Sequence, residues 1–133
     1  MSNKSTGTAF EKEMAELLSI EKFWVHLFVP SAYGQPADLI AVKNNNPYLI
    51  DCKDCKNDTF PLSRVEPNQE SAMDYWKTLQ NGQGWFALKL SNNTIWMMGM
   101  DTILAAKNYK HTLNKCDITS TGYPFKRWVG ERS

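Results

Sequence analysis

The chain has 133 residues and a mass of 15.2 kDa, so we expect a single domain over residues 1–133 with one hydrophobic core. Its composition, 42% apolar and 22% charged, excludes a disordered or collagen-like protein, and its formal net charge of +1 gives no long-range field for nucleic acid. The longest apolar run, residues 23–29, is too short to cross a bilayer, and three cysteines argue against a disulfide framework. We therefore expect a cytoplasmic protein with no membrane partner.

The N-terminal part predicts a helix followed by a strand. Apolar residues recur at helical spacing over residues 8–20, and Thr8 with Glu11 forms the T-x-x-E pattern of a capping box. The apolar run 23–29 is typical of a strand. We expect this strand to end in a turn over residues 31–34, which directly follow a proline.

A hairpin with unusual polar residues is predicted next. Residues 38–43 and 48–53 are apolar runs joined by Asn-Asn-Asn-Pro, which indicates an antiparallel pair. With all four of these residues in the loop, Asp38 lies opposite Lys53, and Asp51 is diagonal to Asp38. Because side chains alternate across a strand, the three charged residues then share one face and one end of a hairpin that is otherwise apolar on both faces.

The rest of the chain predicts more helices and a second hairpin. In chain order we expect a loop over residues 58–67, a helix over 68–80, a strand pair over 85–90 and 94–98, a short helix capped by Asp101 and ending near residue 108, and a candidate strand over 123–129. This order predicts an α/β fold in which helices pack on a mixed sheet.

The charged residues of the first hairpin suggest a metal site. Asp38 and Asp51 repel each other when both are ionised, unless a cation lies between them. Hard oxygen ligands suit Mg²⁺ or Mn²⁺, and Lys53 could orient a water or neutralise charge that develops on a phosphate. The alternative is an exposed ion pair between Asp38 and Lys53, with no function and little effect on stability.

These residues also carry a resemblance to a nuclease family. Pro36-Ala-Asp38 followed by Asp51-Cys-Lys53 matches the P-D…(D/E)-x-K pattern of restriction-endonuclease-like nucleases. Residues 50–62, with the sequence IDCKDCKNDTFPL, and the later Gln69 are similar to the RecU family of Holliday junction resolvases, which carry E-x-K, K-N-x-T, F-P-L and a Gln in that order. The opening GTAFE of residues 7–11 also resembles that family's first helix.

The resemblance implies a metal-dependent endodeoxyribonuclease with a restriction-endonuclease-like core, a mixed β-sheet flanked by helices. It implies Mg²⁺ as cofactor, with Mn²⁺ able to substitute, and a homodimer that resolves four-way DNA junctions in recombination and repair. The implied site residues are Asp38, Asp51, Lys53 and Glu11 for catalysis, with Asp38, Asp51 and Glu11 on the metal, and Lys56, Thr59, Phe60 and Gln69 on DNA.

Two of these residues have simpler explanations, and the chain departs from the family in two respects. Glu11 could only close its capping box, and Gln69 could be an exposed polar residue in a helix's first turn. Asp51 stands where the family usually has Glu, and the segment between Glu11 and Asp38 is too short for the stalk insertion of RecU proteins. A compact resolvase like the archaeal junction-cleaving enzymes, or a phage nuclease of the superfamily, fits this length.

Other functions stay open at this point. A nuclease of the same superfamily could act on flaps, ends or duplex DNA, and a catalytically silent domain could bind DNA structures while keeping the fold. The pattern Cys52-x-x-Cys55 also occurs in zinc and redox sites. The cysteine pair of a redox site lies at the N-terminus of a helix, whereas Cys52 lies in a predicted strand. A zinc site would need further ligands, and the obvious candidates are only His111 and Cys116.

Overall fold

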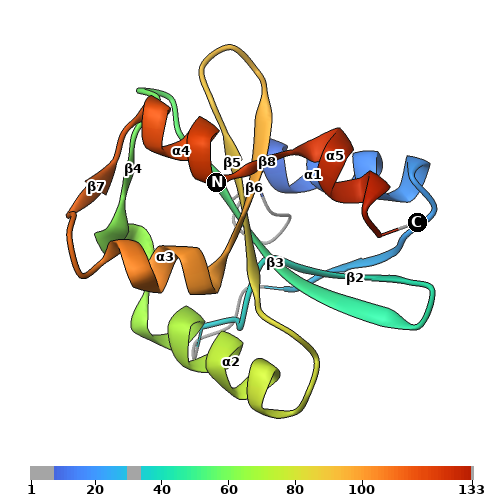
Figure 1. Ribbon diagram of the computed structural model, residues 1–133. Helices are drawn as coiled ribbons and strands as arrows, with labels where there is room; N and C mark the ends of the chain where they lie inside the picture. Colours follow the sequence, from blue (N-terminus) through green and yellow to red (C-terminus); the bar gives the residue numbers. More distant parts are fainter. Residues whose placement is uncertain (1–7, 30–33, 133) are drawn as a thin grey trace.

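A six-stranded mixed sheet with helices on both faces organises the chain (Figure 1). The computed structural model describes residues 8–29 and 34–132. The elements are α1 (Ala9–Ile20), β1 (Trp24–Leu27), β2 (Leu39–Lys43), β3 (Asn46–Asp54), β4 (Phe60–Pro61), the 3₁₀ turn η2 (Leu62–Arg64), α2 (Pro67–Thr78), β5 (Trp85–Lys89), β6 (Ile95–Gly99), α3 (Met100–Ala106), β7 (Thr112–Leu113), α4 (Lys115–Thr121), β8 (Tyr123–Pro124) and α5 (Phe125–Gly130).

The strand order of the sheet is β1-β2-β3-β5-β6-β8, and β4 pairs separately with β7. Strands β3 and β5 are parallel, with Ile50 beside Trp85, whereas every other pair in the described sheet is antiparallel. A parallel pair needs a crossover connection, which here contains η2 and α2. The predicted α/β fold with a mixed sheet and flanking helices is therefore confirmed.

The first helix begins as the sequence predicts. Thr8 Oγ1 accepts a hydrogen bond from the Glu11 N–H at 3.2 Å, and the Thr8 N–H donates to Glu11 Oε1 at 3.2 Å. Phe10, Met14 and Leu18 form the buried stripe of α1. The capping box thus fixes the backbone and the side chain of Glu11 at the start of the helix.

The first hairpin has a shorter loop than predicted. Lys43 pairs with Asn46, so the loop is the pair Asn44-Asn45, whose φ values of 53° and 68° suit the tight turn that joins antiparallel strands. Asparagine tolerates this left-handed backbone better than most residues. The predicted register is therefore wrong by two residues along β3, but a shift of two keeps each side chain on its predicted face.

Three further predictions need correction. The segment 58–67, expected as a loop, contains β4 and η2, because Phe60 pairs with Leu113 and is drawn into the core. Gly99, not Asp101, caps α3, and Asp101 lies in its first turn. Residues 123–129 form only the short β8 before α5, since Pro124 ends the pairing. The turn predicted over 31–34 lies outside the described residues except for Gly34.

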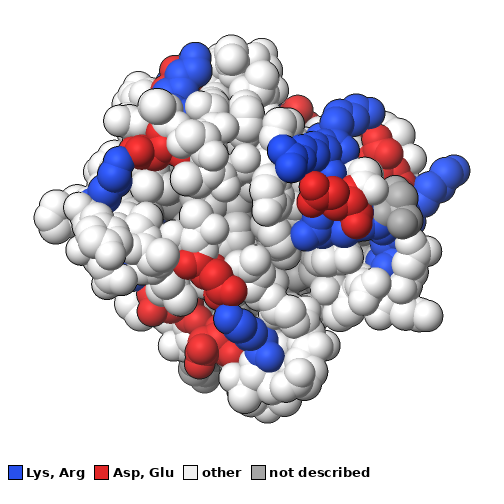
Figure 2. All heavy atoms as spheres, viewed as in Figure 1, with Lys and Arg blue, Asp and Glu red and all other residues white. Residues whose placement is uncertain are grey.

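The surface carries mixed charges. Figure 2 shows one face, on which Lys and Arg gather mainly over α1 and α5 with Glu between them, while Asp and Glu gather over α2 and α3. The two signs nearly balance, in agreement with the net charge of +1. In the described part of the chain, every helix is too short or too polar to span a bilayer.

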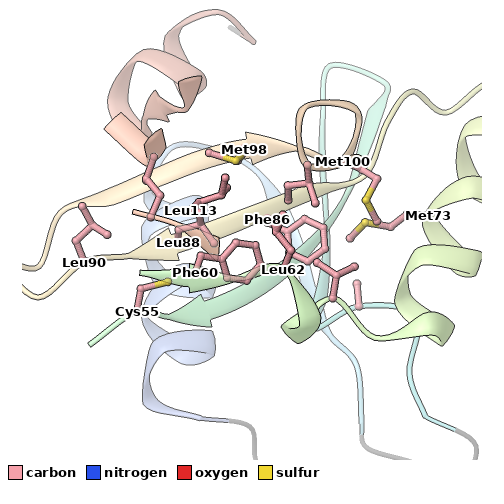
Figure 3. Close-up of a cluster of buried hydrophobic side chains, with 14 of the residues drawn as sticks. Cys55, Phe60, Leu62, Met73, Phe86, Leu88, Leu90, Met98, Met100 and Leu113 are labelled. Carbon is pink, nitrogen blue, oxygen red and sulfur yellow. The ribbon is translucent and has the colours of Figure 1, made fainter. Parts of the chain in front are cut away.

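Two buried clusters lie on opposite faces of the sheet. One, beneath α1 and α5, includes the fully buried Trp128. The other, beneath α2 and α3, includes Phe60, Phe86 and Met73 (Figure 3). Gly84, directly before β5, lets α2 approach closely, because a methyl group there would overlap the Met73 side chain. This close approach brings the first turn of α2 against β3.

Candidate active site

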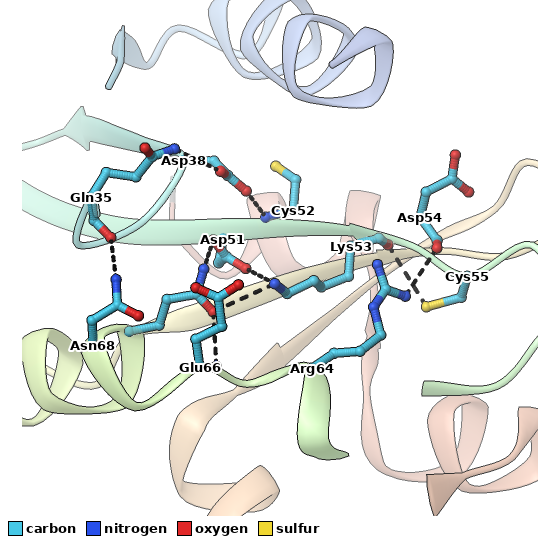
Figure 4. A network of polar contacts seen from close by, with 11 residues as sticks. Gln35, Asp38, Asp51, Cys52, Lys53, Asp54, Cys55, Arg64, Glu66 and Asn68 are labelled. Atoms are coloured by element: carbon cyan, nitrogen blue, oxygen red, sulfur yellow. Dashed lines mark hydrogen bonds and ion pairs between the residues drawn. The ribbon is translucent and has the colours of Figure 1, made fainter. Parts of the chain in front are cut away.

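The acidic residues predicted from the sequence converge around the middle of β3 (Figure 4). A cavity of about 300 Å³ is lined by Glu11 from α1, Asp38 before β2, Lys53 from β3, Arg64 from η2 and Gln69 from α2. Five segments, spread over residues 11–69, therefore meet at one place. The fold brings the predicted catalytic set together.

Asp51 is the most deeply buried charged residue of the described chain, with 0% of its surface exposed. Its Oδ1 accepts a hydrogen bond from Gln69 Nε2 at 2.9 Å. Its Oδ2 lies 2.9 Å from Lys53 Nζ, but this contact is not aligned as a hydrogen bond and Oδ2 has no hydrogen-bond partner. Burial, and then the charge of Asp38, raise the pKa of Asp51 to about 8 despite the nearby ammonium.

Asp38 is tied to the backbone on both sides of Asp51. Its N–H donates to the Ile50 carbonyl at 3.1 Å, and its Oδ2 accepts a hydrogen bond from the Cys52 N–H at 2.7 Å. Gln35 Nε2 reaches Oδ1 more weakly, at 3.5 Å. The corrected register explains this position, because it moves Asp51 from a diagonal neighbour of Asp38 to the residue beside it.

Gln69 links Asp51 to Lys53 from the start of α2. Its Oε1 accepts a hydrogen bond from Lys53 Nζ at 3.4 Å and another from the Glu66 N–H at 3.3 Å, which closes the first turn of the helix. Only 7% of Gln69 is exposed. The side chain therefore lies against Asp51 and at the cavity wall, and its contact with DNA stays a prediction. Pro67 at the first helical position and a Gln two residues later were the available signals for this capping role.

Glu11 closes its capping box and also lies at the cavity, so its position is compatible with both of the roles that the sequence left open. Its carboxylate remains in the capping box with Thr8, and it also lines the cavity beside Asp38. Burial, and then the charge of Asp38, raise its pKa. Within residues 8–29 and 34–132, no three His, Cys, Asp or Glu side chains form a ready-made metal cluster. The candidate metal ligands are therefore the carboxylates of the Asp38–Asp51 pair, with that of Glu11 next to them.

These carboxylates fit a hard divalent cation. Asp51 Oδ2 is buried and has the Lys53 ammonium 2.9 Å away as an ion-pair partner, but no aligned hydrogen bond, so a cation bound there would compensate its burial further. The pKa values of Asp51 and Glu11 are raised first by burial and then by the charge of Asp38, and a bound cation would oppose both effects by favouring the ionised carboxylates. Carboxylate oxygens are ligands that Mg²⁺ and Mn²⁺ prefer.

The remaining residues predicted to contact DNA differ in accessibility. Lys56 is exposed and Thr59 is half-buried. Phe60 is fully buried, with its ring centroid 6.1 Å from that of Phe86, so the prediction that it contacts DNA is wrong. The strand pair β4–β7 holds the Phe60 backbone, and an aromatic residue is more stable in the core than on the surface. Arg64, which sequence reasoning missed, lies in a segment without helical or strand periodicity.

The two cysteines of the C-x-x-C pattern are structural. Cys52 lies within β3, and its pKa is raised by burial and by the charge of Asp38. Cys55 is buried, and burial raises its pKa to about 11. A raised pKa favours the unreactive thiol over the thiolate that redox and zinc sites require. The structure therefore offers neither alternative in the described residues.

Comparison with known proteins identifies a family. The sequence pattern of the family described as "Archaeal holliday junction resolvase (hjc)" matches residues 2–130. The fold is similar to the 1.6 Å structure of Archaeoglobus fulgidus Hjc, a Holliday junction resolvase from an archaeal hyperthermophile, with a TM-score of 0.73 and 15% identity over 93% of this chain and 98% of that one. No curated protein sequence matches. These findings support a resolvase family but not RecU in particular, and they give no support to a bacterial or phage origin.

The raised pKa of Asp51 predicts an unusual pH dependence of stability. The pKa is about 8 in the folded protein and 3.8 ordinarily, so the folded state binds more protons between these values. The stability that Asp51 contributes is therefore present below about pH 4 and lost as the pH rises towards 8. In chelator, we expect Asp51→Asn to increase the free energy of unfolding at pH 8 by about 1 to 4 kcal/mol.

Urea unfolding of both proteins between pH 5 and pH 8 measures this difference. We expect the advantage of Asp51→Asn to shrink steadily as the pH falls. Asp58, whose pKa is lowered by hydrogen bonds from Ser91, supplies a control of opposite sign: Asp58→Asn should cost stability at pH 8. An Asp51→Asn variant that is less stable than wild type at pH 8 would contradict the buried, proton-binding carboxyl group.

Proposed function

The chain belongs to the archaeal Holliday junction resolvase (Hjc) family, and from this premise we propose that it is an endonuclease that resolves four-way DNA junctions by hydrolysing phosphodiester bonds. One observation supports the catalytic part most strongly. Asp51 is fully buried behind the cavity wall, beside Asp38 and 2.9 Å from Lys53, and its Oδ2 has no aligned hydrogen bond. A core has no structural need for such an arrangement, whereas metal-assisted hydrolysis does.

The cofactor we propose is Mg²⁺, with Mn²⁺ able to replace it. Asp38 and Asp51 would hold the cation, and Glu11 would be a further acidic group next to it. A bound divalent cation supplies positive charge that acidifies water and stabilises the negative charge of the transition state and the leaving group. The positive charge would also favour the ionised form of Asp51, whose pKa is raised to about 8 by burial and then by the charge of Asp38.

Lys53 and Gln69 act on this pair in different ways. Lys53 keeps only 12% of its side chain exposed, so its ammonium faces the cavity and can orient the attacking water or stabilise charge on the phosphate. Gln69 is a positioning residue, because its hydrogen bond to Oδ1 fixes the rotation of the Asp51 carboxylate and so the direction of Oδ2. Asp51 is one carbon shorter than the usual Glu, and the close pairing with Asp38 supports ligation at this shorter reach.

We propose that the working form is a homodimer in the cytoplasm, where it meets DNA. A four-way junction is symmetric and its resolution needs two coordinated cuts, which two copies related by a two-fold axis can make. Large apolar side chains are available for such an interface: Trp24 is 64% exposed, Tyr75 65% and Leu79 52%. Sedimentation velocity should give about twice the 15.2 kDa of one chain, and a monomer on the junction at micromolar concentration would contradict the dimer.

Cleavage of defined substrates tests the proposed activity. Wild-type protein is incubated with a labelled four-way junction, a flap and a linear duplex, with Mg²⁺ or with chelator. We expect cleavage of the junction only when Mg²⁺ is present, and a loss of at least about a hundredfold in Asp38→Ala and Lys53→Ala, because each removes a charge that acts on the reacting phosphate. Lys77→Ala is the matched control, since Lys77 belongs to an exposed ion pair with Asp101 at 3.0 Å.

Each negative result removes a different part of the proposal. If wild type cleaves no DNA with Mg²⁺ or Mn²⁺, the domain is a silent DNA-structure-binding protein. If it cleaves flap, duplex and junction at equal rates, it is a nuclease without junction selectivity. If cleavage survives both Asp38→Ala and Lys53→Ala, the active site lies elsewhere.

A further inference from the structure

Arg64 is a cation of the active-site cavity whose charge is not neutralised. The other cation of the cavity, Lys53, lies 2.9 Å from Asp51 and donates to Gln69. Arg64 Nη1 donates instead to the main-chain carbonyl of Asp54, at 3.1 Å. Among residues 8–29 and 34–132, no carboxylate lies within ion-pair distance of its guanidinium.

The position of Arg64 is fixed by the packing on both sides of it. It ends η2, between Leu62, which is 3% exposed, and Val65, which is 5% exposed. The Leu62 N–H also donates to the His111 carbonyl at 2.9 Å. In Figure 4 the side chain extends from η2 to the end of β3, on the same side of the strand as Lys53. The turn therefore holds a half-buried guanidinium at the cavity wall in advance of any ligand.

The cavity is otherwise rich in negative charge, so a free cation there favours the binding of an anion. Glu11, Asp38 and Glu66 also line it, and their carboxylates repel a phosphodiester. A guanidinium has five donors in a planar fork that matches phosphate oxygens. Here Arg64 donates to the Asp54 carbonyl and also interacts with the neutral Cys55 thiol, so no partner balances its charge and donors remain for a phosphate. With a net charge of only +1, the protein has little long-range attraction for DNA, so a local contact of this kind would hold DNA at the proposed metal site.

We propose that Arg64 is a substrate-binding residue that donates hydrogen bonds to a backbone phosphate of the DNA strand being cut. This inference rests on the proposed nuclease function and assigns Arg64 a role in it. Anchored to Asp54 O, Arg64 sets the distance between the bound strand and the carboxylate pair. Lys56 does not replace it, because Lys56 is exposed and is not part of the cavity wall.

The experiment compares Arg64→Gln and Arg64→Lys with wild type on four-way junctions. The matched control is Arg127→Gln, which removes the same charge from an exposed pair with Glu131 at 3.3 Å. One set of junctions carries a single neutral methylphosphonate at each position around the cut in turn. Cleavage is measured in Mg²⁺ under single-turnover conditions, and binding is measured in chelator by fluorescence anisotropy at several salt concentrations.

We expect Arg64→Gln to lower kcat/KM and junction affinity by about tenfold to a hundredfold, because a charge-assisted hydrogen bond is lost. Its salt slope should fall by about one relative to wild type. At one position the methylphosphonate should weaken junction binding and cleavage by the wild type. The same methylphosphonate should not weaken binding or cleavage by Arg64→Gln any further. Arg64→Lys keeps the charge but not the planar fork, so its affinity and cleavage rate should lie between those of wild type and Arg64→Gln. Arg127→Gln should respond to each methylphosphonate as the wild type does.

Two results would overturn the inference. One is an Arg64→Gln variant that binds and cleaves like wild type. The other is a weakened Arg64→Gln variant that keeps the full sensitivity to every methylphosphonate, since this would mean that Arg64 acts only through the fold. Circular dichroism checks folding, and if Arg64→Gln is unfolded, the same phosphate comparison is made with Arg64→Lys. A wild type that binds the junction without cutting it contradicts the nuclease function, while the binding measurements still decide the role of Arg64.

Discussion

The burial of Asp51 in the middle of β3 is the constraint that the neighbouring elements have to accommodate. Removing a carboxylate from water costs several kcal/mol unless partners replace the lost hydration. The protein supplies two, Lys53 at 2.9 Å and Gln69 at 2.9 Å, but leaves Oδ2 without a hydrogen bond. The result is a carboxyl group whose pKa is raised to about 8, and which a cation in the proposed metal site would return to its ionised form.

The two helices that flank the site each place a side chain of their first turn in it. Glu11 belongs to the capping box of α1 and Gln69 to that of α2, so the interactions that start each helix also place a polar side chain beside the Asp38–Asp51 pair. The parallel pairing of β3 with β5, and the close approach of α2 that Gly84 permits, set the depth of Gln69. Local helix stability and site geometry are thus coupled, and a change that loosens either helix also alters the carboxylate pair.

Much of this arrangement could be predicted from the sequence, for specific reasons. The period-two pattern of the first hairpin fixed which face Asp51 and Lys53 share, and this survived an error of two residues in the register. The role of Gln69 depends on contacts between α2 and β3, which no local pattern encodes. Phe60 was misassigned because its burial follows from the pairing of β4 with the distant β7. Arg64 had no periodic pattern around it, and only the folded cavity shows that it faces the carboxylates.

The pKa of Asp51 itself, followed by the carbon-13 chemical shift of its carboxyl group with and without Mg²⁺, tests the account most directly. In chelator the account predicts an apparent pKa near 8, far above the ordinary 3.8, because the buried carboxyl group lies beside Asp38. Addition of Mg²⁺ should lower it by more than about one unit, since bound cations favour the ionised form. A carboxyl group that titrates near its ordinary value in chelator, or one that Mg²⁺ leaves unchanged, would contradict the proposed metal site.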